Sequence, residues 1–198
     1  MIIKVCGLSD NQSGRTIAQQ KEVSFLGFIF YEKSPRFTST TVNTSKKKIG
    51  VFVNEELPII LNLVKTHQLS GIQLHGNEPP EFVSQLPSDL LKIKAFGISN
   101  VADLEKTAEY DGLVDYFLFD TKSNEFGGSG KTFDWKILED YHGNTPFILS
   151  GGIGLETAHL LDSFQHPKLV GFDLNSRFER SPKDKNVTQI QQFIRAVL

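Results

Sequence analysis

Cys6 and Asp120 could transfer protons, and each stands at the end of a short apolar run. A thiolate can accept a proton, and a carboxyl group among apolar rings has a raised pKa, which suits a proton donor. Lys4 precedes Cys6 by two positions, so on a strand it shares the same face and would favour the thiolate. Two plainer interpretations stay open, namely Cys6 as an inert core residue and Asp120 in an ion pair with Lys94.

Two turns rich in glycine and polar residues have the chemistry for binding phosphate. The first holds Gly151 and Gly152 in the stretch SGGIG, and the second holds Asp173, Asn175 and Ser176 in the stretch FDLNS. Glycines let backbone N–H groups approach an anion, and the positive end of a following helix stabilises it. We therefore expect a phosphate site at these turns, with glycines that merely make a tight turn as the alternative.

Two further polar residues follow strand-like runs. Arg36 lies in the stretch FYEKSPRF, where its guanidinium could hold a carboxylate through two parallel hydrogen bonds. The alternative for Arg36 is a solvated loop residue. His75 lies in the stretch QLHG and is either a polar wall of a pocket or a hydrogen-bonded core histidine.

Two glycine patterns fall short of nucleotide-binding motifs. Gly130-Lys131-Thr132 is similar to the end of a phosphate-binding P-loop, but the position of that motif's first glycine holds Glu125. Gly152-Ile153-Gly154 would begin a dinucleotide fingerprint, but the position of its third glycine holds Thr157. We therefore predict no nucleotide cofactor.

A regular alternation of elements must position these residues. Eight apolar, β-branched or aromatic runs follow one another at intervals of about one βα unit: Ile2–Cys6, Phe25–Phe30, Ile49–Val53, Gly71–His75, Leu91–Phe96, Tyr116–Asp120, Phe147–Gly151 and Leu169–Leu174. These intervals are too long for hairpins. We predict an α/β protein, a closed (β/α)8 TIM barrel formed as one domain by residues 1–198, with an open doubly wound sheet as the alternative. In such a barrel the functional residues lie where the strands end.

Apolar stripes with helical spacing lie between the runs. The clearest are Leu57–Val64 and Ile190–Val197. Weaker stripes cover residues 82–86, 101–108 and 155–164. Ser181-Pro182, before the last stripe, is typical of an N-cap followed by proline at the first helical position. Between Phe37 and Ile49 only polar and β-branched residues remain, so we predict a shortened second helix.

Composition and charge exclude several classes of function. A formal net charge of −2 argues against sequence-independent nucleic-acid binding. The single cysteine excludes an intramolecular disulfide and a multi-thiolate metal site, and the five histidines lie too far apart for an HExxH-type site. No apolar run approaches the length of a membrane span and no leader pattern begins the chain, so we expect no membrane association and a cytoplasmic location.

Eight blocks of the sequence together resemble the phosphoribosylanthranilate isomerase family of tryptophan biosynthesis, over essentially the full length. In order, they are VCGLSD, GFIFYEKSPRF, GVFVNE, IQLHGNE, KAFGIS, FDTKSNEFGGSGKTFDW, LSGGI and FDLNSRFE. The QLHG and FDTKSNEFGGSGKTFDW blocks are the most specific.

The resemblance implies a (β/α)8 barrel that converts N-(5′-phosphoribosyl)anthranilate into 1-(2-carboxyphenylamino)-1-deoxyribulose 5-phosphate by an Amadori rearrangement, without a metal or an organic cofactor. At matching positions it implies that Cys6 is the general base, that Asp120 is the general acid and that Arg36 contacts the anthranilate portion. Further family positions are matched by Gly151, Gly152 and Asp173. The expected partner is the small phosphosugar substrate, and we expect a monomer, with a homodimer as the alternative.

The sequence departs from the common family pattern near its end. Asn175-Ser176-Arg177 stands where many members have Ser-Ser-Gly, so Arg177 either contacts the phosphate or caps the loop outward. Pro182-Lys183 replaces a frequent Pro-Gly. Two rival functions stay open: another phosphosugar barrel, such as a metal-dependent ribulose-phosphate epimerase, and a non-catalytic phosphosugar-binding barrel. The first would need metal-binding residues at the strand ends, and the second would predict loss of Cys6 or Asp120.

Overall fold

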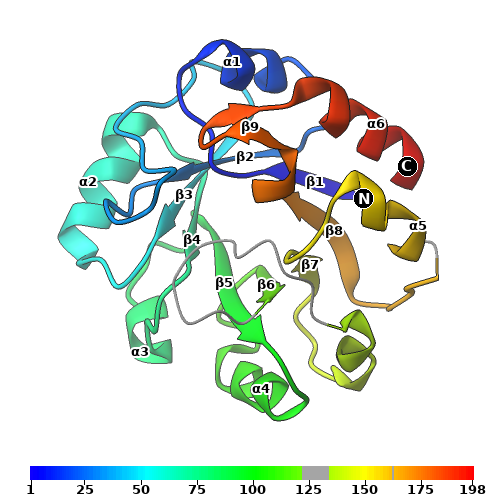
Figure 1. The fold of residues 1–198 in the computed structure, drawn as a ribbon. Coiled ribbons are helices and arrows are strands. Elements are labelled where there is room, and N and C mark those ends of the chain that lie inside the picture. Colours follow the sequence, from blue (N-terminus) through cyan, green and yellow to red (C-terminus); the bar gives the residue numbers. More distant parts are fainter. Residues whose placement is uncertain (122–133, 162) are drawn as a thin grey trace.

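Eight parallel strands close into a barrel in the computed structural model, which describes residues 1–121, 134–161 and 163–198 (Figure 1). The strands are β1 (Ile2–Val5), β2 (Phe25–Ile29), β3 (Lys47–Phe52), β4 (Gly71–Leu74), β5 (Leu91–Ile98), β6 (Tyr116–Thr121), β7 (Phe147–Leu149) and β8 (Leu169–Leu174). Each pairs in parallel with the next, and β8 returns to β1. The predicted barrel is confirmed, and the open sheet is excluded because β1 and β8 are not edge strands.

Strand alternation decides which side chains face the barrel axis. An apolar cluster inside the barrel takes one or two residues from most strands: Phe25, Ile49, Ile93, Ala95, Leu118 and Ile148. On β6, Phe117 and Phe119 belong to the larger cluster between the strands and the outer layer. Asp120 therefore shares the inner face with Leu118, as the alternation of side chains requires. By the same parity Lys4 and Cys6 face inward, whereas Ile3 and Val5 pack outward.

Short helices surround the ring of strands (Figure 1). They are α1 (Gln12–Ala18), α2 (Leu57–His67), α3 (Pro80–Val83), α4 (Ala102–Glu105), η1 (Lys106–Tyr110), η2 (Trp135–Asp140), η3 (Leu155–Thr157), α5 (Ala158–Leu161), η4 (Ser176–Phe178) and α6 (Val187–Val197). The predicted stripe of α6 is confirmed, since Ile190, Phe193 and Ile194 are buried. None of the helices in the described part of the chain has the length and apolarity needed to span a bilayer.

The predicted second helix is not merely shortened but absent, because residues 30–46 contain no helix. The segment is instead fixed by local contacts: the Thr38 amide donates to the Ile29 carbonyl at 2.9 Å, and the Lys46 ammonium donates to the Val23 carbonyl at 2.7 Å. Val42 is buried in the outer core. This polar, β-branched segment can bury single side chains such as Val42. It lacks the apolar stripe that a helix would need in order to pack against the strands.

The predicted N-cap at Ser181-Pro182 is also wrong. Ser181 ends β9 (Glu179–Ser181), which forms a hairpin with β10 (Asp184–Lys185) across a turn in which Lys183 has a φ of 71°. Helix α6 is capped by Asn186, whose side chain accepts a hydrogen bond from the Gln189 amide at 3.2 Å. Proline serves the turn here, because its fixed φ suits a turn as well as a helix start.

Candidate active site

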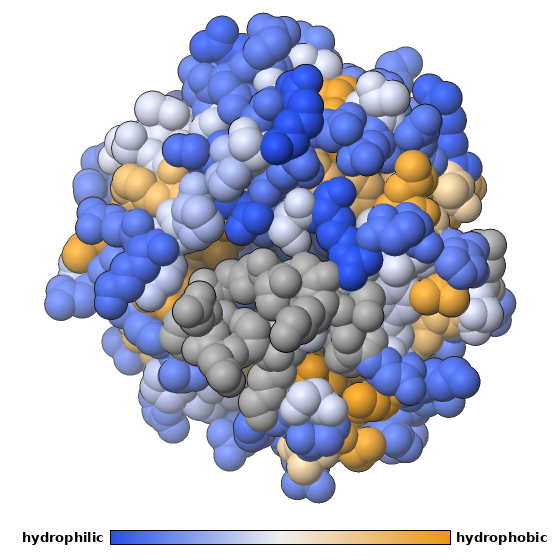
Figure 2. Space-filling view, viewed as in Figure 1, coloured by the Kyte–Doolittle hydropathy of each residue, from blue (hydrophilic) through white to orange (hydrophobic). Residues whose placement is uncertain are grey.

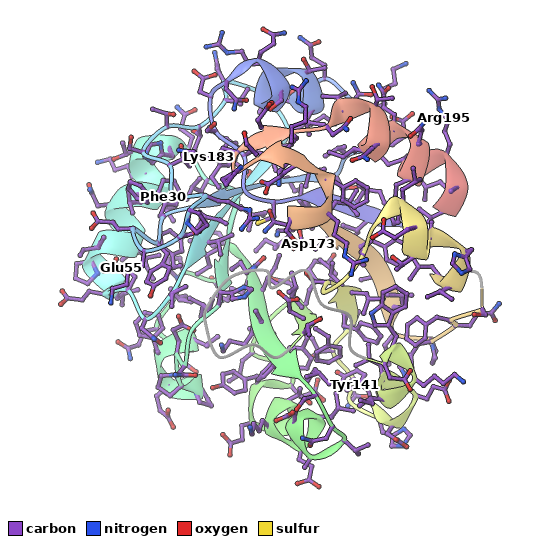
Figure 3. The ribbon with its side chains drawn as sticks, viewed as in Figure 1. Phe30, Glu55, Tyr141, Asp173, Lys183 and Arg195 are labelled. Atoms are coloured by element: carbon purple, nitrogen blue, oxygen red, sulfur yellow. The ribbon has the colours of Figure 1, made fainter. Side chains whose placement is uncertain are left out.

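A cavity lies at the carboxyl ends of the strands, where barrel proteins place their function. Six strands or the segments directly after them contribute its lining: Cys6, Ile29, Tyr31, Ser34, Val51, Val53, Gln73, His75, Asp120, Asp173 and Asn175. Asp173 lies near the centre of the ring of strands (Figure 3). The rim of this face is mostly hydrophilic, with apolar side chains in small separate groups (Figure 2). The cavity thus joins five of the predicted site residues, Cys6, His75, Asp120, Asp173 and Asn175.

Cys6 lies beside a buried ion pair at the bottom of this cavity. The Lys4 ammonium donates to Asp173 Oδ1 at 2.8 Å and is fully buried, and the Ser150 hydroxyl reaches Asp173 Oδ2 at 3.4 Å. The predicted proximity of Lys4 to Cys6 is confirmed, since the Lys4 ammonium lies close enough to lower the pKa of the Cys6 thiol. The net effect differs from the prediction, however: burial raises the pKa of the Cys6 thiol, Asp173 adds to this, and Lys4 and Lys185 only partly offset it.

Asp120 carries the raised pKa that its sequence position predicts. Burial raises the pKa of this carboxyl to about 6, although the Thr121 amide donates to Oδ1 at 2.7 Å and lowers it. The alternative ion pair with Lys94 is wrong. The Lys94 side chain lies on the outer face of β5, where its ammonium contacts Glu78 Oε2 at 3.2 Å and the Gly76 carbonyl at 2.8 Å.

His75 forms part of the cavity wall, as one of its two interpretations predicts. Its Nε2 lies 3.9 Å from Asp120 Oδ2, which is beyond hydrogen-bond distance. Burial, together with the positive charges of Lys4 and Lys94, lowers the pKa of His75 to about 4, against the opposing effect of Asp173. The imidazole is therefore neutral at pH 7.

Arg36 is held in place by a buried carboxylate and is not a solvated loop residue. Its Nε and Nη2 both contact Glu179 Oε2 at 2.8 Å. The Lys185 ammonium contacts the other oxygen of Glu179 at 2.6 Å and Asn175 Oδ1 at 2.9 Å. The loop after β2 is thereby tied to the segment after β8. Position 7, which lies against Arg36 and Asn175, requires glycine. Its φ is 71°, and a Cβ there would lie 2.8 Å from both Arg36 Cδ and Asn175 Oδ1.

The turn after β7 lies beside the Asp120 carboxyl at the end of β6, and an ion pair joins it to the turn after β8. Gly151 has a φ of 74°, and a Cβ on it would meet Asp120 Oδ1 at 2.8 Å, so the close approach of this turn requires glycine. Ser176 begins η4 in the following turn. Arg177 forms an ion pair with Glu156 of η3. The ion pair ties the two turns together.

Sequence reasoning did not select Gln73, Glu179 and Lys185 as site residues. Glu179 is 143 residues from Arg36, and a single sequence gives no sign that two residues so far apart will form an ion pair. Gln73 could have been found, since it precedes His75 by two positions and therefore shares its inward parity. The Gly130–Thr132 pattern and most of the FDTKSNEFGGSGKTFDW block lie outside the described residues. Within the described ranges, no group of three His, Cys, Asp or Glu side chains could hold a metal ion.

Comparison with known proteins identifies the family. The family model described as N-(5′phosphoribosyl)anthranilate (PRA) isomerase matches residues 3–196. The N-(5′-phosphoribosyl)anthranilate isomerase of Parabacteroides distasonis is 46% identical to this chain, over 100% of this chain and 94% of its own length.

Two solved structures agree with this match. Monomers generated from the dimeric phosphoribosylanthranilate isomerase of Thermotoga maritima superpose with a TM-score of 0.82 at 30% identity, covering 100% of this chain and 98% of theirs. A phosphoribosyl anthranilate isomerase in complex with reduced 1-(o-carboxyphenylamino)-1-deoxyribulose 5-phosphate superposes with a TM-score of 0.81 at 29% identity, again covering 100% and 98% of the two chains. The chain thus belongs to the N-(5′-phosphoribosyl)anthranilate isomerase family of enzymes.

Proposed function

We propose that this chain catalyses the isomerisation of N-(5′-phosphoribosyl)anthranilate to 1-(2-carboxyphenylamino)-1-deoxyribulose 5-phosphate in tryptophan biosynthesis. The observation that carries the proposal is the placement of the Cys6 thiol and the Asp120 carboxyl in the lining of one cavity, at the ends of β1 and β6. The related structure that holds the reduced product supports the same substrate class. In this proposal residues 1–198 form one catalytic domain that acts in the cytoplasm, as a monomer.

Asp120 acts as the acid in the first step. Its proton passes to the ribose ring oxygen, the C1′–O bond breaks, and the nitrogen lone pair forms the iminium of a Schiff base. The iminium makes the C2′ hydrogen acidic, and Cys6 as thiolate removes it to give an enolamine. The enolamine becomes the ketone as C1′ gains a proton and the 2′-hydroxyl loses one. Each such acid or base contributes typically about 10²–10⁴-fold to the rate.

The two pKa values determine how this pair holds its proton. Between a pKa of about 6 for Asp120 and the raised pKa of Cys6, the pair holds one proton in total. The productive form has that proton on Asp120 and leaves Cys6 as thiolate, next to the Lys4 ammonium. The other one-proton form has the proton on Cys6 and leaves Asp120 as a carboxylate. Both forms have the same net charge, so the ratio of their populations does not change with pH across this interval.

The pH dependence of kcat/KM follows with a definite sign. It should rise as pH increases through about 6, where the pair loses its first proton, stay level, and fall where Cys6 loses the second. The substrate phosphate also titrates near pH 6. Asp120→Asn distinguishes the substrate phosphate from Asp120, because in this variant only the phosphate should still titrate near pH 6. A wild-type rate that keeps rising through alkaline pH would contradict a shared proton.

The activity itself is tested by following the anthranilate fluorescence of the substrate, which should decay when the purified protein is added. A parallel sample of the Cys6→Ser/Asp120→Asn double variant controls for spontaneous breakdown of the substrate. Equal decay rates in the two samples would overturn the proposed function.

Arg36 binds the anthranilate carboxylate in this proposal, while Gly151, Gly152, Asp173, Asn175 and Ser176 surround the phosphosugar. Arg36→Ala should raise KM about 10–100-fold with a smaller change in kcat, because a charge-assisted pair contributes about 1.5–3 kcal/mol. Inhibition by anthranilate should weaken by a similar factor, whereas inhibition by inorganic phosphate should not change. Arg15→Ala, which removes an exposed arginine paired with Asp10, is the matched control. An unchanged KM in Arg36→Ala would remove the assigned role.

A further inference from the structure

Gln73 is a buried polar residue of the cavity wall to which the acid–base steps give no role. It lies on β4 with the same inward parity as His75, and it is 1% exposed. Its amide Nε2 lies 2.8 Å from His75 Nδ1, while its Oε1 is buried and has no hydrogen-bond partner among the described residues. Buried polar atoms without partners are uncommon in folded interiors, so a polar side chain at this position calls for an explanation beyond packing.

The contact between the amide and the imidazole has one chemical consequence. With the amide nitrogen of Gln73 facing His75, that nitrogen donates, so Nδ1 accepts and carries no hydrogen. The 3.9 Å separation of His75 Nε2 from Asp120 Oδ2 favours the same tautomer, because Nε2–H then faces a carboxyl oxygen as a donor. In a neutral imidazole the hydrogen then resides on Nε2. We propose that Gln73 is a positioning residue that fixes the Nε2–H tautomer of His75, so that His75 presents a hydrogen-bond donor to the Asp120 carboxyl.

The surroundings of His75 favour a neutral donor. Among the described residues, the charged groups that act on its pKa are the Lys4 ammonium on β1, the Lys94 ammonium on β5 and the Asp173 carboxylate on β8, and the Asp120 carboxyl on β6 lies 3.9 Å from its Nε2. Burial and the two ammonium groups outweigh the Asp173 carboxylate, which keeps the pKa of His75 at about 4. The ring therefore donates a hydrogen bond without releasing a proton at pH 7.

The donor acts when Asp120 has given up its proton, so this inference rests on the proposed function. His75 Nε2 and Asp120 Oδ2 are 3.9 Å apart, and such contacts commonly shorten when substrate binds. A hydrogen bond from Nε2–H then stabilises the new carboxylate while the sugar ring is open. In the other tautomer, a lone pair on Nε2 would face that carboxylate and oppose its formation.

The tautomer can be measured without any turnover. Long-range ¹H–¹⁵N correlation spectra of protein labelled with ¹⁵N-histidine, at pH 7, distinguish Nε2–H from Nδ1–H, and His75→Asn assigns the signals of His75 by their loss. The wild type should show Nε2–H for His75. A wild-type Nδ1–H tautomer would overturn the inference whatever the activity of the protein, whereas absence of isomerase activity with an Nε2–H tautomer would overturn the proposed function alone.

Gln73→Glu changes the tautomer with little change of shape. Its carboxylate can only accept, so it should draw the hydrogen of His75 to Nδ1 and lower kcat about 10–100-fold, the loss expected for one hydrogen bond to a charged group, with a smaller change in KM. Gln73→Met, which removes the donor without imposing a tautomer, should show both tautomers and an intermediate kcat. Gln12→Glu adds the same charge on an exposed turn of α1 and should leave spectrum and rate unchanged. A wild-type tautomer and kcat in Gln73→Glu and Gln73→Met would overturn the inference.

Discussion

Asp120→Asn should lower kcat by at least about 100-fold while KM stays within a few-fold of the wild-type value. Asparagine has nearly the same shape, and its side-chain oxygen can still accept the hydrogen bond that the Thr121 amide donates to Asp120 Oδ1. What it lacks is the acidic proton. Without that proton, the ribose oxygen leaves as an alkoxide, so the loss falls on the transition state of ring opening rather than on binding.

A loss of activity through altered folding would look different. The free energy of unfolding of Asp120→Asn should stay close to that of the wild type or rise, because a neutral amide replaces a carboxyl that is costly to ionise in a buried site. Asp89→Asn, an identical change at an exposed position after α3, should leave kcat and stability unchanged. A rate within a few-fold of wild type in Asp120→Asn would remove the acid role from this residue.

Cys6→Ser should also lower kcat by at least about 100-fold, for a different reason. The Lys4 ammonium can stabilise a thiolate here, but a serine hydroxyl is so much less acidic that the same ammonium leaves it protonated. Serine is smaller than cysteine and fits the same space beside Gly27, where Cys6 Sγ would lie only 2.8 Å from an added Cβ. Substrate binding should therefore change little.

Two comparisons distinguish loss of the general base from a change in the shape of the site. Cys6→Ala should be as slow as Cys6→Ser, since neither side chain supplies a base, and both should retain wild-type anthranilate inhibition. Chemical rescue gives the contrasting result: a small exogenous thiol should restore part of the rate in Cys6→Ala and none in Asp120→Asn. Turnover by Cys6→Ala within a few-fold of the wild type would exclude the thiol as the base.

The parts of this structure that depend on periodicity could be predicted from the sequence. Regular apolar runs determine eight strands, because each must bury both of its faces between the barrel interior and the helices. Strand parity then correctly placed Lys4 beside Cys6 and turned Asp120 toward the cavity. The carboxyl ends of the strands, where those residues lie, meet at one mouth of the barrel whatever the helices do.

What could not be predicted depends on long-range contacts and on competing magnitudes. The Arg36–Glu179–Lys185 network joins segments that only the closed barrel brings together. The pKa of Cys6 depends on whether burial or the Lys4 ammonium has the larger effect, and the sequence contains the ammonium but not the depth of burial. Proline at position 182 suits both a hairpin turn and a helix start, so the sequence alone did not decide between them.

The deuterium isotope effect on kcat with substrate labelled at C2′ distinguishes ring opening by Asp120 from removal of the C2′ hydrogen by Cys6. In Cys6→Ser, removal of that hydrogen becomes the slow step, so a full primary isotope effect is expected. In Asp120→Asn, ring opening becomes slow and the isotope effect should be close to unity. A full isotope effect in Asp120→Asn with none in Cys6→Ser would contradict the assignment of acid and base.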